Sequence, residues 1–318
     1  MYNSLNHKTT MPKPIYINKR AIGPDLPPYI IAELSANHNG DIGRAMAILE
    51  MAKRSGADAV KLQTYTQDTL TLNCTKPDFM ITDGLWQGRT LYDLYSEAHM
   101  PWAWHQPLFR RARELELTIF SSPFDQTAVD YLEDLNAPAY KIASFEMIDL
   151  PLIKYVAKTG KPMIISTGMA NAEEIAEAID TAKSNGCQDV VVLHCVSAYP
   201  APAQDYNLRT MQDIANKFNV LTGLSDHTLD NTTAITAVAL GACMIEKHVT
   251  LDRAGGGPDD SFSLEEPELT QLCEQTLTAW KALGTENYAR QSSELGNIMF
   301  RRSLYVVKDI KAGEKFTT

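Results

Sequence analysis

The sequence predicts an α/β fold, a (β/α)8 TIM barrel, because one pattern repeats along the chain. Short runs rich in β-branched residues are each followed by a stretch with helical periodicity. Near-continuous hydrophobic strands that alternate with helices are typical of a parallel sheet covered by helices on its outer face. Eight such units over roughly 255 residues match the size of a (β/α)8 barrel. A doubly wound sheet is the alternative, but it would not need eight regular units.

The predicted strands and helices have the lengths of ordinary barrel units. The strands are 29–34, 59–64, 117–122, 139–144, 162–167, 190–195, 220–225 and 243–249, and the helices include 42–55, 127–135, 172–184, 232–240 and 267–283. Asn171, with Glu174 three residues later, has the spacing of a capping box, and Asp125 stands before the helix at 127–135. Gly56 and Gly241 each come just before a strand, where the end of a helix favours positive φ.

Three segments lie outside the predicted barrel domain, which we place at 29–285. Residues 1–28 contain Pro-rich and polar stretches and are expected to form a cap or hairpin under the barrel. Residues 65–105 form an aromatic-rich insertion after the second strand, and a loop of that length is usually functional. Residues 286–318 are expected to be a linker followed by the truncated start of a second small domain.

Composition and charge exclude several classes of protein. A hydrophobic content of 44% in 318 residues supplies a sizeable core and excludes global disorder. Lys and Arg number 29 against 39 Asp and Glu, and the net charge of −10 argues against a nucleic-acid groove. There is no apolar run of about 18 residues and no signal-peptide h-region, so we expect neither a membrane span nor secretion. The five scattered cysteines are interpreted as reduced thiols of a cytoplasmic protein rather than as zinc ligands.

Polar and charged residues gather at the carboxyl ends of the predicted strands. They are Glu33, Lys61, Gln63, Ser121, Ser122, Lys141, Ser144, Ser166, Thr167, His194, Ser225, Asp226, His227, Glu246, Lys247 and His248. The active site of (β/α)8 enzymes lies at this end of the barrel. Burying Lys or Glu in a strand costs much desolvation energy unless the charge is paired. A structural ion pair would explain any one of these residues, but not the same choice at all eight strands.

The lysines and hydroxyls of this set predict an anionic ligand. Lys61 and Lys141 lie on the second and fourth strands, with Ser122, Ser144 and Ser166 on neighbouring strands. Cations and hydroxyl donors that converge on one place suit a phosphate, or a molecule with both carboxylate and phosphate groups. The negative net charge does not exclude such a ligand, because a few local cations are enough to bind it.

The histidines predict a metal site, with a second interpretation left open. His227 and His248 end two adjacent strands, and two His with carboxylate and water suit a divalent transition metal. The alternative is that each is a hydrogen-bonded core residue. Glu33 faces the same mouth and is a candidate general base or water-orienting residue. A salt bridge from Glu33 to a lysine is its structural alternative, and the two roles are compatible.

Nine motifs, taken in order, resemble the sialic acid synthases, a family of phosphoenolpyruvate-dependent enzymes that make nine-carbon 2-keto sugar acids. The motifs are AELSANHNGD, GADAVKLQTY, FSSPFD, YKIASFE, STGMA, LHCVSAYP, GLSDHT, IEKHVTLD and GGPDDSFSLE. The resemblance covers residues 15–318. Within the family, the motif sequences most resemble those of the pseudaminate branch. The branches that make N-acetylneuraminate or legionaminate are alternatives, and a sugar-binding barrel without catalysis is a remote one.

The resemblance implies a role for each residue that matches a family motif. Phosphoenolpyruvate or its phosphate would be bound by Lys61, Ser122, Lys141, Ser144, Ser166 and Ser225, and the sugar by Gln63, Tyr199 and Asp259. The metal would be bound by His227 and His248. Glu33 matches the glutamate near the metal and the reacting aldehyde, so that Glu33, Lys61, Lys141, His227 and His248 would form the catalytic group.

The resemblance also implies a cofactor and partners. The cofactor would be a divalent metal, Mn²⁺ in the first place, with Mg²⁺ or Co²⁺ as alternatives. The substrates would be phosphoenolpyruvate and an amino sugar, whose apolar groups suit aromatic residues of the insertion, namely Trp86, Tyr92, Trp102 and Trp104. Packing of the insertion is the alternative role for these aromatics. In this family a C-terminal antifreeze-like (SAF) domain reaches into the partner subunit, so we expect a cytoplasmic homodimer, with residues 286–318 as the linker and the start of that domain.

Overall fold

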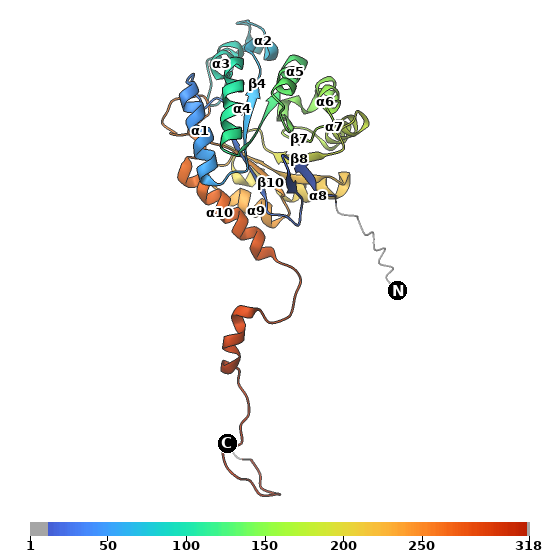
Figure 1. Cartoon of the computed structure of the whole chain (residues 1–318), viewed down its shortest axis with the longest axis vertical. Helices are drawn as coiled ribbons and strands as arrows, with labels where there is room; N and C mark the ends of the chain where they lie inside the picture. Colours follow the sequence, from blue (N-terminus) through green and yellow to red (C-terminus); the bar gives the residue numbers. More distant parts are fainter. Residues whose placement is uncertain (1–11, 317–318) are drawn as a thin grey trace. The chain divides into compact units, whose positions relative to one another are not determined.

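The structure is a computed structural model that describes residues 12–316. The chain divides between Leu283 and Gly284 into two compact units. All the strands of the described part of the chain lie in the first unit, which holds the barrel (Figure 1). None of the helices in residues 12–316 is both long and apolar enough to cross a membrane.

Eight parallel strands of the first unit form a closed barrel. They are β3 (Tyr29–Glu33), β4 (Ala59–Thr64), β5 (Thr118–Pro123), β6 (Tyr140–Ile142), β7 (Met163–Ser166), β8 (Val190–Cys195), β9 (Leu221–Asp226) and β10 (Met244–His248). Each strand pairs with the next one along the chain, and β10 pairs with β3 to close the sheet. The predicted (β/α)8 TIM barrel is therefore confirmed.

The largest difference from the predicted strands is at β6. The strand expected over 139–144 ends at Ile142, and Ser144 begins a short 3-10 helix, η3 (Ser144–Ile148). The reason is local, because the backbone N–H of Glu146 donates to the carbonyl of Ala143 instead of to a neighbouring strand. Ser144 therefore lies in the loop above β6.

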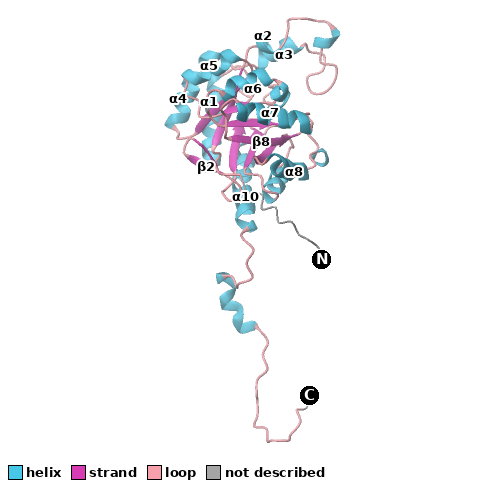
Figure 2. Cartoon of the chain, turned by 90° about the vertical axis from the view of Figure 1, so that its right-hand side faces the viewer, coloured by secondary structure: helices cyan, strands magenta, loops and turns pink. Residues whose placement is uncertain are grey.

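Helices surround the barrel on its outside (Figure 2). They are α1 (Ile42–Ser55), α4 (His105–Glu114), α5 (Gln126–Asp134), α6 (Leu150–Ala157), α7 (Ala172–Ser184), α8 (Arg209–Phe218), α9 (Thr232–Ala239) and α10 (Glu266–Leu283). The five predicted helices agree with the structure to within one residue at each end. The Asn171–Glu174 capping box and the Asp125 cap are both present, and Gly56 ends α1 at φ 89°.

The predicted insertion and cap each contain regular structure. The insertion holds α2 (Gln67–Leu70), η1 (Pro77–Phe79), α3 (Leu91–Ala98) and η2 (Trp102–Trp104), and Figure 1 shows α2 and α3 together beyond one end of the barrel. The cap contains an antiparallel hairpin of β1 (Ile15–Ile17) and β2 (Arg20–Ile22). Residues 1–11 of the predicted cap lie outside the described residues.

Two apolar cores follow from the alternation of side chains along each strand. The larger core fills the space between the strands and the helices. The smaller core fills the barrel interior at the amino ends of the strands and includes hairpin residues Ile15, Ile17 and Ile22. The hairpin therefore closes the amino end of the barrel and leaves the carboxyl end for polar side chains.

The second unit, described to residue 316, contains one 3-10 helix, η6 (Ser292–Phe300). No strand is present between residues 284 and 316, although apolar residues such as Leu304, Val306 and Val307 are numerous there and exposed. The assignment of this segment to the start of a SAF domain stays a prediction.

Candidate active site

The strand alternation separates the polar residues of the carboxyl end into two sets. On each strand, the apolar residues of the smaller core face the interior, and residues an even number of positions away face it too. By this rule the interior set is Glu33, Lys61, Gln63, Ser122, Lys141, Ser166, Cys195, Ser225, Glu246 and His248. The outward set is Ser121, Thr167, His194, Asp226 and Lys247. The outward set faces the helices, so these five residues do not belong to the interior site although they share the carboxyl end of the barrel.

Lys61 lies at the centre of the interior set. Its Nζ atom is 3.0 Å from Glu33 Oε2 and 3.4 Å from Glu246 Oε1, and it donates to Ser122 Oγ at 3.3 Å. Burial opposes the charge of Lys61, but the two carboxylates outweigh it and raise the pKa of the lysine above its usual value. Lys61 is therefore a fully charged cation in a site closed to bulk water.

Lys141 also pairs with Glu246, but its positive charge has fewer carboxylates close to it than that of Lys61. Lys141 Nζ is 3.4 Å from Glu246 Oε1, the same oxygen that Lys61 approaches. Burial lowers the pKa of Lys141, because this lysine has one close carboxylate instead of two. Burial alone would raise the pKa of Glu246, but Lys141 and Lys61 together bring it below its usual value. Glu246 is thus the shared anion of two lysines.

Glu33 differs from Glu246 in its electrostatics. Glu33 is completely buried, and this burial raises its pKa despite the nearby charge of Lys61. Gln63 donates from Nε2 to Glu33 Oε1 at 2.9 Å, whereas Glu33 Oε2 is an ion-pair partner of Lys61. A buried carboxyl group with a raised pKa is able to hold or release a proton near neutral pH. The salt bridge and the acid–base role both remain consistent with this geometry.

Hydroxyl groups line the space beside the lysines. Ser144 Oγ lies 3.3 Å from Cys195 Sγ, and the Oγ atoms of Ser166 and Ser197 are buried without a hydrogen-bond partner among the described residues. Gly168, at φ 49°, allows this packing, since a Cβ atom there would lie 2.4 Å from the Cβ atom of Ser144 and 2.9 Å from Ser197 Oγ. Ser225 is buried opposite Glu246 in the β9–β10 register. Unpartnered hydroxyls beside two lysines suit an anionic ligand.

His227 and His248 face each other across the neighbouring ends of β9 and β10. Their ring centroids are 5.4 Å apart. His227 Nδ1 lies 2.8 Å from the carbonyl oxygen of Val196, which fixes the tautomer and leaves Nε2 with a free lone pair. Burial lowers the pKa of His227 to about 4, and burial together with His227 lowers the pKa of His248 well below its usual value. Both imidazoles are therefore neutral, the form that ligates metal.

The two histidines fit a divalent metal site. His248 Nδ1 is buried without a hydrogen-bond partner in residues 12–316, and Glu246 Oε2 is in the same condition. A histidine ligand commonly donates its second ring N–H to a backbone carbonyl, as His227 does. Within residues 12–316, no three His, Cys, Asp or Glu side chains are close enough to hold an ion by themselves. The protein would thus supply two imidazoles and leave other positions to water or substrate.

Tyr199 and Asp259 approach the histidines from the loops above β8 and β10. The Tyr199 ring centroid lies 4.3 Å from that of His227, and Asp259 Oδ2 lies 3.7 Å from His248 Nδ1. Asp259 also accepts from Ser35 Oγ, and Ser35 Oγ accepts from Gln63 Nε2 at 3.1 Å. The three residues predicted to contact the sugar are therefore joined to the same site, with Ser35 as a link that was not predicted.

An aromatic wall stands beside the histidines. Phe262 and Tyr199 have ring centroids 5.3 Å apart, and Trp86 of the insertion lies 5.9 Å from Tyr199. Trp86 Nε1 donates to the carbonyl oxygen of Pro258 at 2.9 Å, which fastens the insertion to the loop above β10. Trp86 is about half buried, so part of its ring is open to a ligand.

The other three predicted aromatics of the insertion serve packing. Trp102 stacks on Tyr131 of α5 at 5.0 Å, and Trp104 packs edge-on against His38 at 5.5 Å. The Tyr92 hydroxyl donates to Asp68 within the insertion. Of the four aromatics, Trp86 is the one that the structure brings to Tyr199.

The sequence assigned no role to two carboxylates of the site. Glu246 was named among the strand-end residues, but its pairing with both lysines was not predicted; the strand alternation indicates it, because Glu246 and His248 are two residues apart on one strand. Glu146 lies in η3, and burial raises its pKa to about 7. Its Oε2 atom is buried without a hydrogen-bond partner in residues 12–316. No strand pattern could have placed Glu146, because it lies in a loop.

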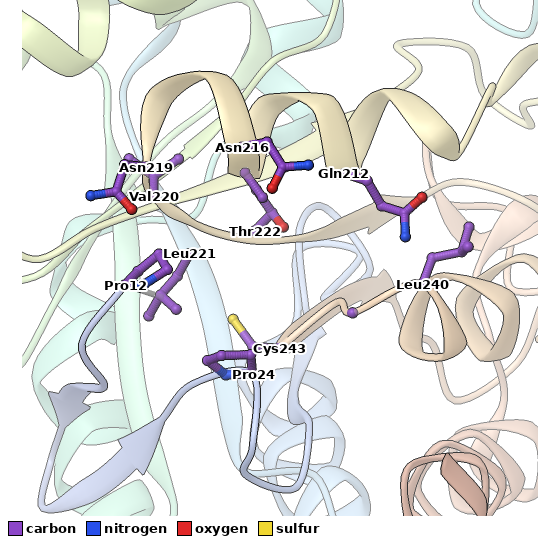
Figure 3. A pocket seen from close by; sticks show the side chains of 12 residues that line it. Pro12, Pro24, Gln212, Asn216, Asn219, Val220, Leu221, Thr222, Leu240 and Cys243 are labelled. Carbon is purple, nitrogen blue, oxygen red and sulfur yellow. The ribbon is translucent and has the colours of Figure 1, made fainter. Parts of the chain in front are cut away.

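A cavity at the amino end of the barrel lacks comparable chemistry. It has a volume of about 220 Å³, and its lining includes Pro12, Pro24, Gln212, Asn216, Leu240 and Cys243 (Figure 3). Prolines, leucine and neutral amides dominate this lining, and no charged side chain belongs to it. The carboxyl end is therefore the candidate active site, in agreement with the position of active sites in this fold.

Lysine, glutamate and histidine side chains are buried together at the carboxyl end of the closed barrel. This arrangement is typical of (β/α)8 enzymes. Residues 48–288 match the NeuB family. Relatives of similar length agree with this match, and the chain belongs to the NeuB family. The resemblance to the sialic acid synthases is therefore confirmed.

The similar proteins include enzymes that make different sugar acids. The chain is 46% identical to a pseudaminic acid synthase of Helicobacter pylori, over 92% of this chain and 86% of that protein. It is 44% identical to a pseudaminic acid synthase of Campylobacter jejuni, over 91% and 84%. An N,N'-diacetyllegionaminic acid synthase of Campylobacter jejuni is 39% identical, over 91% and 87%.

Solved structures of the same family share the fold. An N-acetylneuraminic acid (sialic acid) synthetase from Leptospira borgpetersenii serovar Hardjo-bovis superimposes with a TM-score of 0.81 at 31% identity, over 92% of this chain and 98% of that chain. The spore coat polysaccharide biosynthesis protein spsE of Bacillus subtilis gives a TM-score of 0.75 at 35% identity, over 85% and 73%. The barrel of this chain is thus also found in these solved structures.

Proposed function

We propose that this chain is a pseudaminic acid synthase. It condenses phosphoenolpyruvate with 2,4-diacetamido-2,4,6-trideoxy-L-altrose to a nine-carbon 2-keto sugar acid and releases phosphate. The observation that carries this proposal is the identity of 44–46% to relatives of that name across more than nine-tenths of the chain. The lower identity of 39% to a legionaminate enzyme favours the altrose derivative as the sugar.

The buried lysines suit phosphoenolpyruvate. Lys61 and Lys141 provide two positive charges in a region from which bulk water is excluded, where charge–charge interactions are strong. In the structure these charges are balanced by Glu33 and Glu246. The hydroxyls of Ser122, Ser144, Ser166 and Ser225 add donors for phosphate oxygens. In this arrangement the lysines bind the phosphate and carboxylate groups and orient the enol carbon toward the sugar.

The reaction forms one carbon–carbon bond and breaks one carbon–oxygen bond. The methylene carbon, C3, of phosphoenolpyruvate attacks C1 of the open-chain sugar, and water then adds to the phosphate-bearing carbon, C2 of the former phosphoenolpyruvate. Collapse of the resulting tetrahedral centre expels phosphate. Glu33 has the raised pKa that a proton acceptor and donor needs near neutral pH, and its contact with Lys61 supports a role next to the proposed phosphoenolpyruvate site. We assign to Glu33 the proton from the attacking water.

His227 and His248 are the residues that would hold a divalent metal, Mn²⁺ in the first place. When bound, such an ion supplies Lewis-acid polarisation of the sugar aldehyde. The chain itself keeps both imidazoles neutral through burial and orients His227 through the Val196 carbonyl. Asp259, beside His248, is placed to accept a hydrogen bond from the sugar.

The aromatic wall suits the apolar groups of this sugar. The altrose derivative is neutral and carries two acetamido groups and a 6-methyl group. Trp86, Tyr199 and Phe262 present ring surfaces next to the histidines. We assign the acetamido and methyl groups to this wall. In keeping with the family, we also propose that the protein is a cytoplasmic homodimer and that residues 286–318 begin the SAF domain.

A substrate panel tests the proposed function. The full chain is incubated with Mn²⁺, phosphoenolpyruvate and one of three sugars: the altrose derivative, the legionaminate precursor or N-acetylmannosamine. We expect phosphate release to be fastest with the altrose derivative. A preference for either of the other two sugars would move the proposal to that branch of the family. Tight sugar binding without phosphate release from any of them would instead support a barrel that has lost catalysis.

His227→Ala tests the metal assignment. Loss of one imidazole ligand is expected to weaken Mn²⁺ binding by at least about 100-fold, because one of only two protein ligands is removed. Calorimetric titration of the metal-free protein measures this directly, and phosphate release should fall in parallel. His99→Ala, in the insertion, serves as the control with unchanged Mn²⁺ affinity. Full Mn²⁺ affinity in the His227 variant would exclude this residue as a ligand.

A further inference from the structure

A buried ion pair lies behind the two candidate metal histidines. Lys247 Nζ is 2.9 Å from Asp226 Oδ2, and the two side chains are only 2% and 0% exposed. Lys247 of β10 and Asp226 of β9 are also direct partners in the strand register. Both belong to the outward set, so they face the helices and not the site. Nothing in the proposed reaction uses either charge.

The ammonium group of Lys247 makes more bonds than an ion pair requires. Besides Asp226, it donates to the backbone carbonyls of Thr228 and Asp230, each at 2.8 Å. These three acceptors use all three N–H donors of the ammonium. The second carboxylate oxygen of Asp226 accepts from the backbone N–H of Thr228 at 2.9 Å. Hydrogen bonds to the Lys247 ammonium therefore hold together both ends of the segment 226–230.

The place of this lysine in the chain connects it to both histidines. Asp226 and Thr228, which it binds, are the residues on either side of His227. Lys247 itself directly precedes His248. The Lys247 side chain thus binds the residues on both sides of His227, while the Lys247 main chain continues directly into His248. A change in the length of this connection would change the distance between the two rings, which is now 5.4 Å.

Stability alone does not account for a charged pair at this position. Removing two charges from water offsets most of their mutual attraction, and burial lowers the pKa of Lys247 accordingly. Apolar residues of similar size would stabilise the protein about as well. Directional bonds to three specific acceptors achieve what apolar packing does not, since they fix the backbone on both sides of His227.

We infer that the Asp226–Lys247 pair is a positioning device that sets the spacing and orientation of His227 and His248 for a divalent metal. This inference rests on the proposed metal role of the two histidines. The pair never touches the metal or the substrates. It acts through the backbone segments that carry the two imidazoles.

A charge-free double variant separates positioning from stability. Asp226→Asn with Lys247→Met removes both charges together, so neither is left buried and unpaired. We expect the metal-free full-length protein to keep its unfolding temperature within a few degrees, while Mn²⁺ binding weakens by about 10- to 100-fold. Phosphoenolpyruvate binding to the metal-free protein should stay within about twofold, because Lys61 and Lys141 are unchanged. The matched control is Arg20→Met with Asp58→Asn, an ion pair of 2.7 Å at the amino end of the barrel.

A second variant keeps the inference testable if the double variant fails to fold. Asp226→Glu preserves both charges and lengthens the connection by one methylene. A pair that only balances charge would tolerate this change, whereas a positioning device would not, so we expect Mn²⁺ affinity to fall at least about fivefold. Unchanged Mn²⁺ affinity in either folded variant would overturn the inference and leave the proposed function intact. Absence of Mn²⁺ binding by the unsubstituted protein would overturn both.

Discussion

The two ends of the barrel interior are built from the same eight strands but hold opposite kinds of side chain. At the amino end, Ile17 and Ile22 of the hairpin pack against interior residues such as Leu193. At the carboxyl end, the next interior positions hold charged residues such as Lys61 and Glu246, which are just as deeply buried. The interior-facing positions of the same strands are therefore apolar at the amino end of the barrel and charged at its carboxyl end.

This difference separates stability from function along one axis. The apolar end contributes burial that lowers the free energy of the folded state. The charged end contributes little net stability, because desolvation offsets the attraction of its ion pairs. Substitutions at the two ends should therefore affect different measurements, and the following predictions test that separation from the largest effect to the smallest.

Lys61→Met should nearly abolish turnover. The substitution removes the cation that contacts Glu33, Glu246 and Ser122, so the anionic substrate loses its central partner. We expect phosphate release to fall at least about 1,000-fold, about 4 kcal/mol of transition-state stabilisation. Lys154→Met, an exposed lysine of α6, is the control with unchanged turnover. Substantial activity of the Lys61 variant would show that the carboxyl end works without its central charge.

Ile17→Ala should reduce stability and leave catalysis unchanged. Ile17 is fully buried in the hairpin that plugs the amino end, and truncating a buried isoleucine costs about 2–5 kcal/mol. Urea unfolding should show the loss. The KM for phosphoenolpyruvate and the kcat should remain within about twofold at temperatures where the variant is folded. A variant of full stability but low activity would contradict the proposed division between the two ends.

Glu146→Gln should stabilise the protein in a pH-dependent way. Burial raises the pKa of Glu146 to about 7, above the unfolded value of 4.5, so the folded state binds this proton more tightly. Glu146 therefore makes the protein less stable as pH rises from about 4.5 to 7, since the buried carboxylate must ionise. The neutral glutamine avoids this loss. We expect a gain of about 3 kcal/mol at pH 8 and none at pH 4, measured by urea unfolding; a constant difference across pH would contradict the prediction.

Trp86→Ala should affect sugar binding in particular. The aromatic wall loses its outermost ring, so the KM for the sugar should rise about tenfold, about 1.4 kcal/mol. The KM for phosphoenolpyruvate should not change, because Trp86 packs against Tyr199 in the loop after β8, whereas the lysines lie on β4 and β6. Leu85→Ala, the exposed neighbour, is the matched control. Equal increases in both KM values would indicate a general disturbance of the loops instead of a sugar contact.

The barrel and most of the site could be predicted because both depend on strand periodicity. Hydrophobic runs separated by helices predicted all eight strands. Because Lys61, Lys141 and Glu33 lie near the carboxyl ends of their strands, the same pattern predicted that they lie close together. The alternation within each strand also distinguishes Glu246, which faces the lysines, from Lys247, which faces the helices. Grouping all strand-end residues together does not separate the residues that face the interior from those that face the helices, although the alternation in the sequence does.

The loop residues could not be predicted, because their positions depend on contacts between distant parts of the chain. Trp86 lies against Tyr199 in a loop that its indole N–H fastens to the Pro258 carbonyl, more than 170 residues later. Ser197 and Ser144 approach each other because Gly168 leaves room between them. Periodicity carries no information on such contacts, so four aromatics of the insertion were equal candidates where the structure favours one.

The pairing of β10 with β3 has a consequence for assembly. Residues Met244 to His248 are in register with Tyr29 to Glu33, so the sheet has no first or last strand. A sheet without edges offers no row of free backbone N–H and C=O groups to another chain. Two copies of this protein therefore cannot associate by extending the barrel sheet. Any contact between two copies would lie outside the barrel sheet, so surface substitutions could alter assembly without disturbing the barrel.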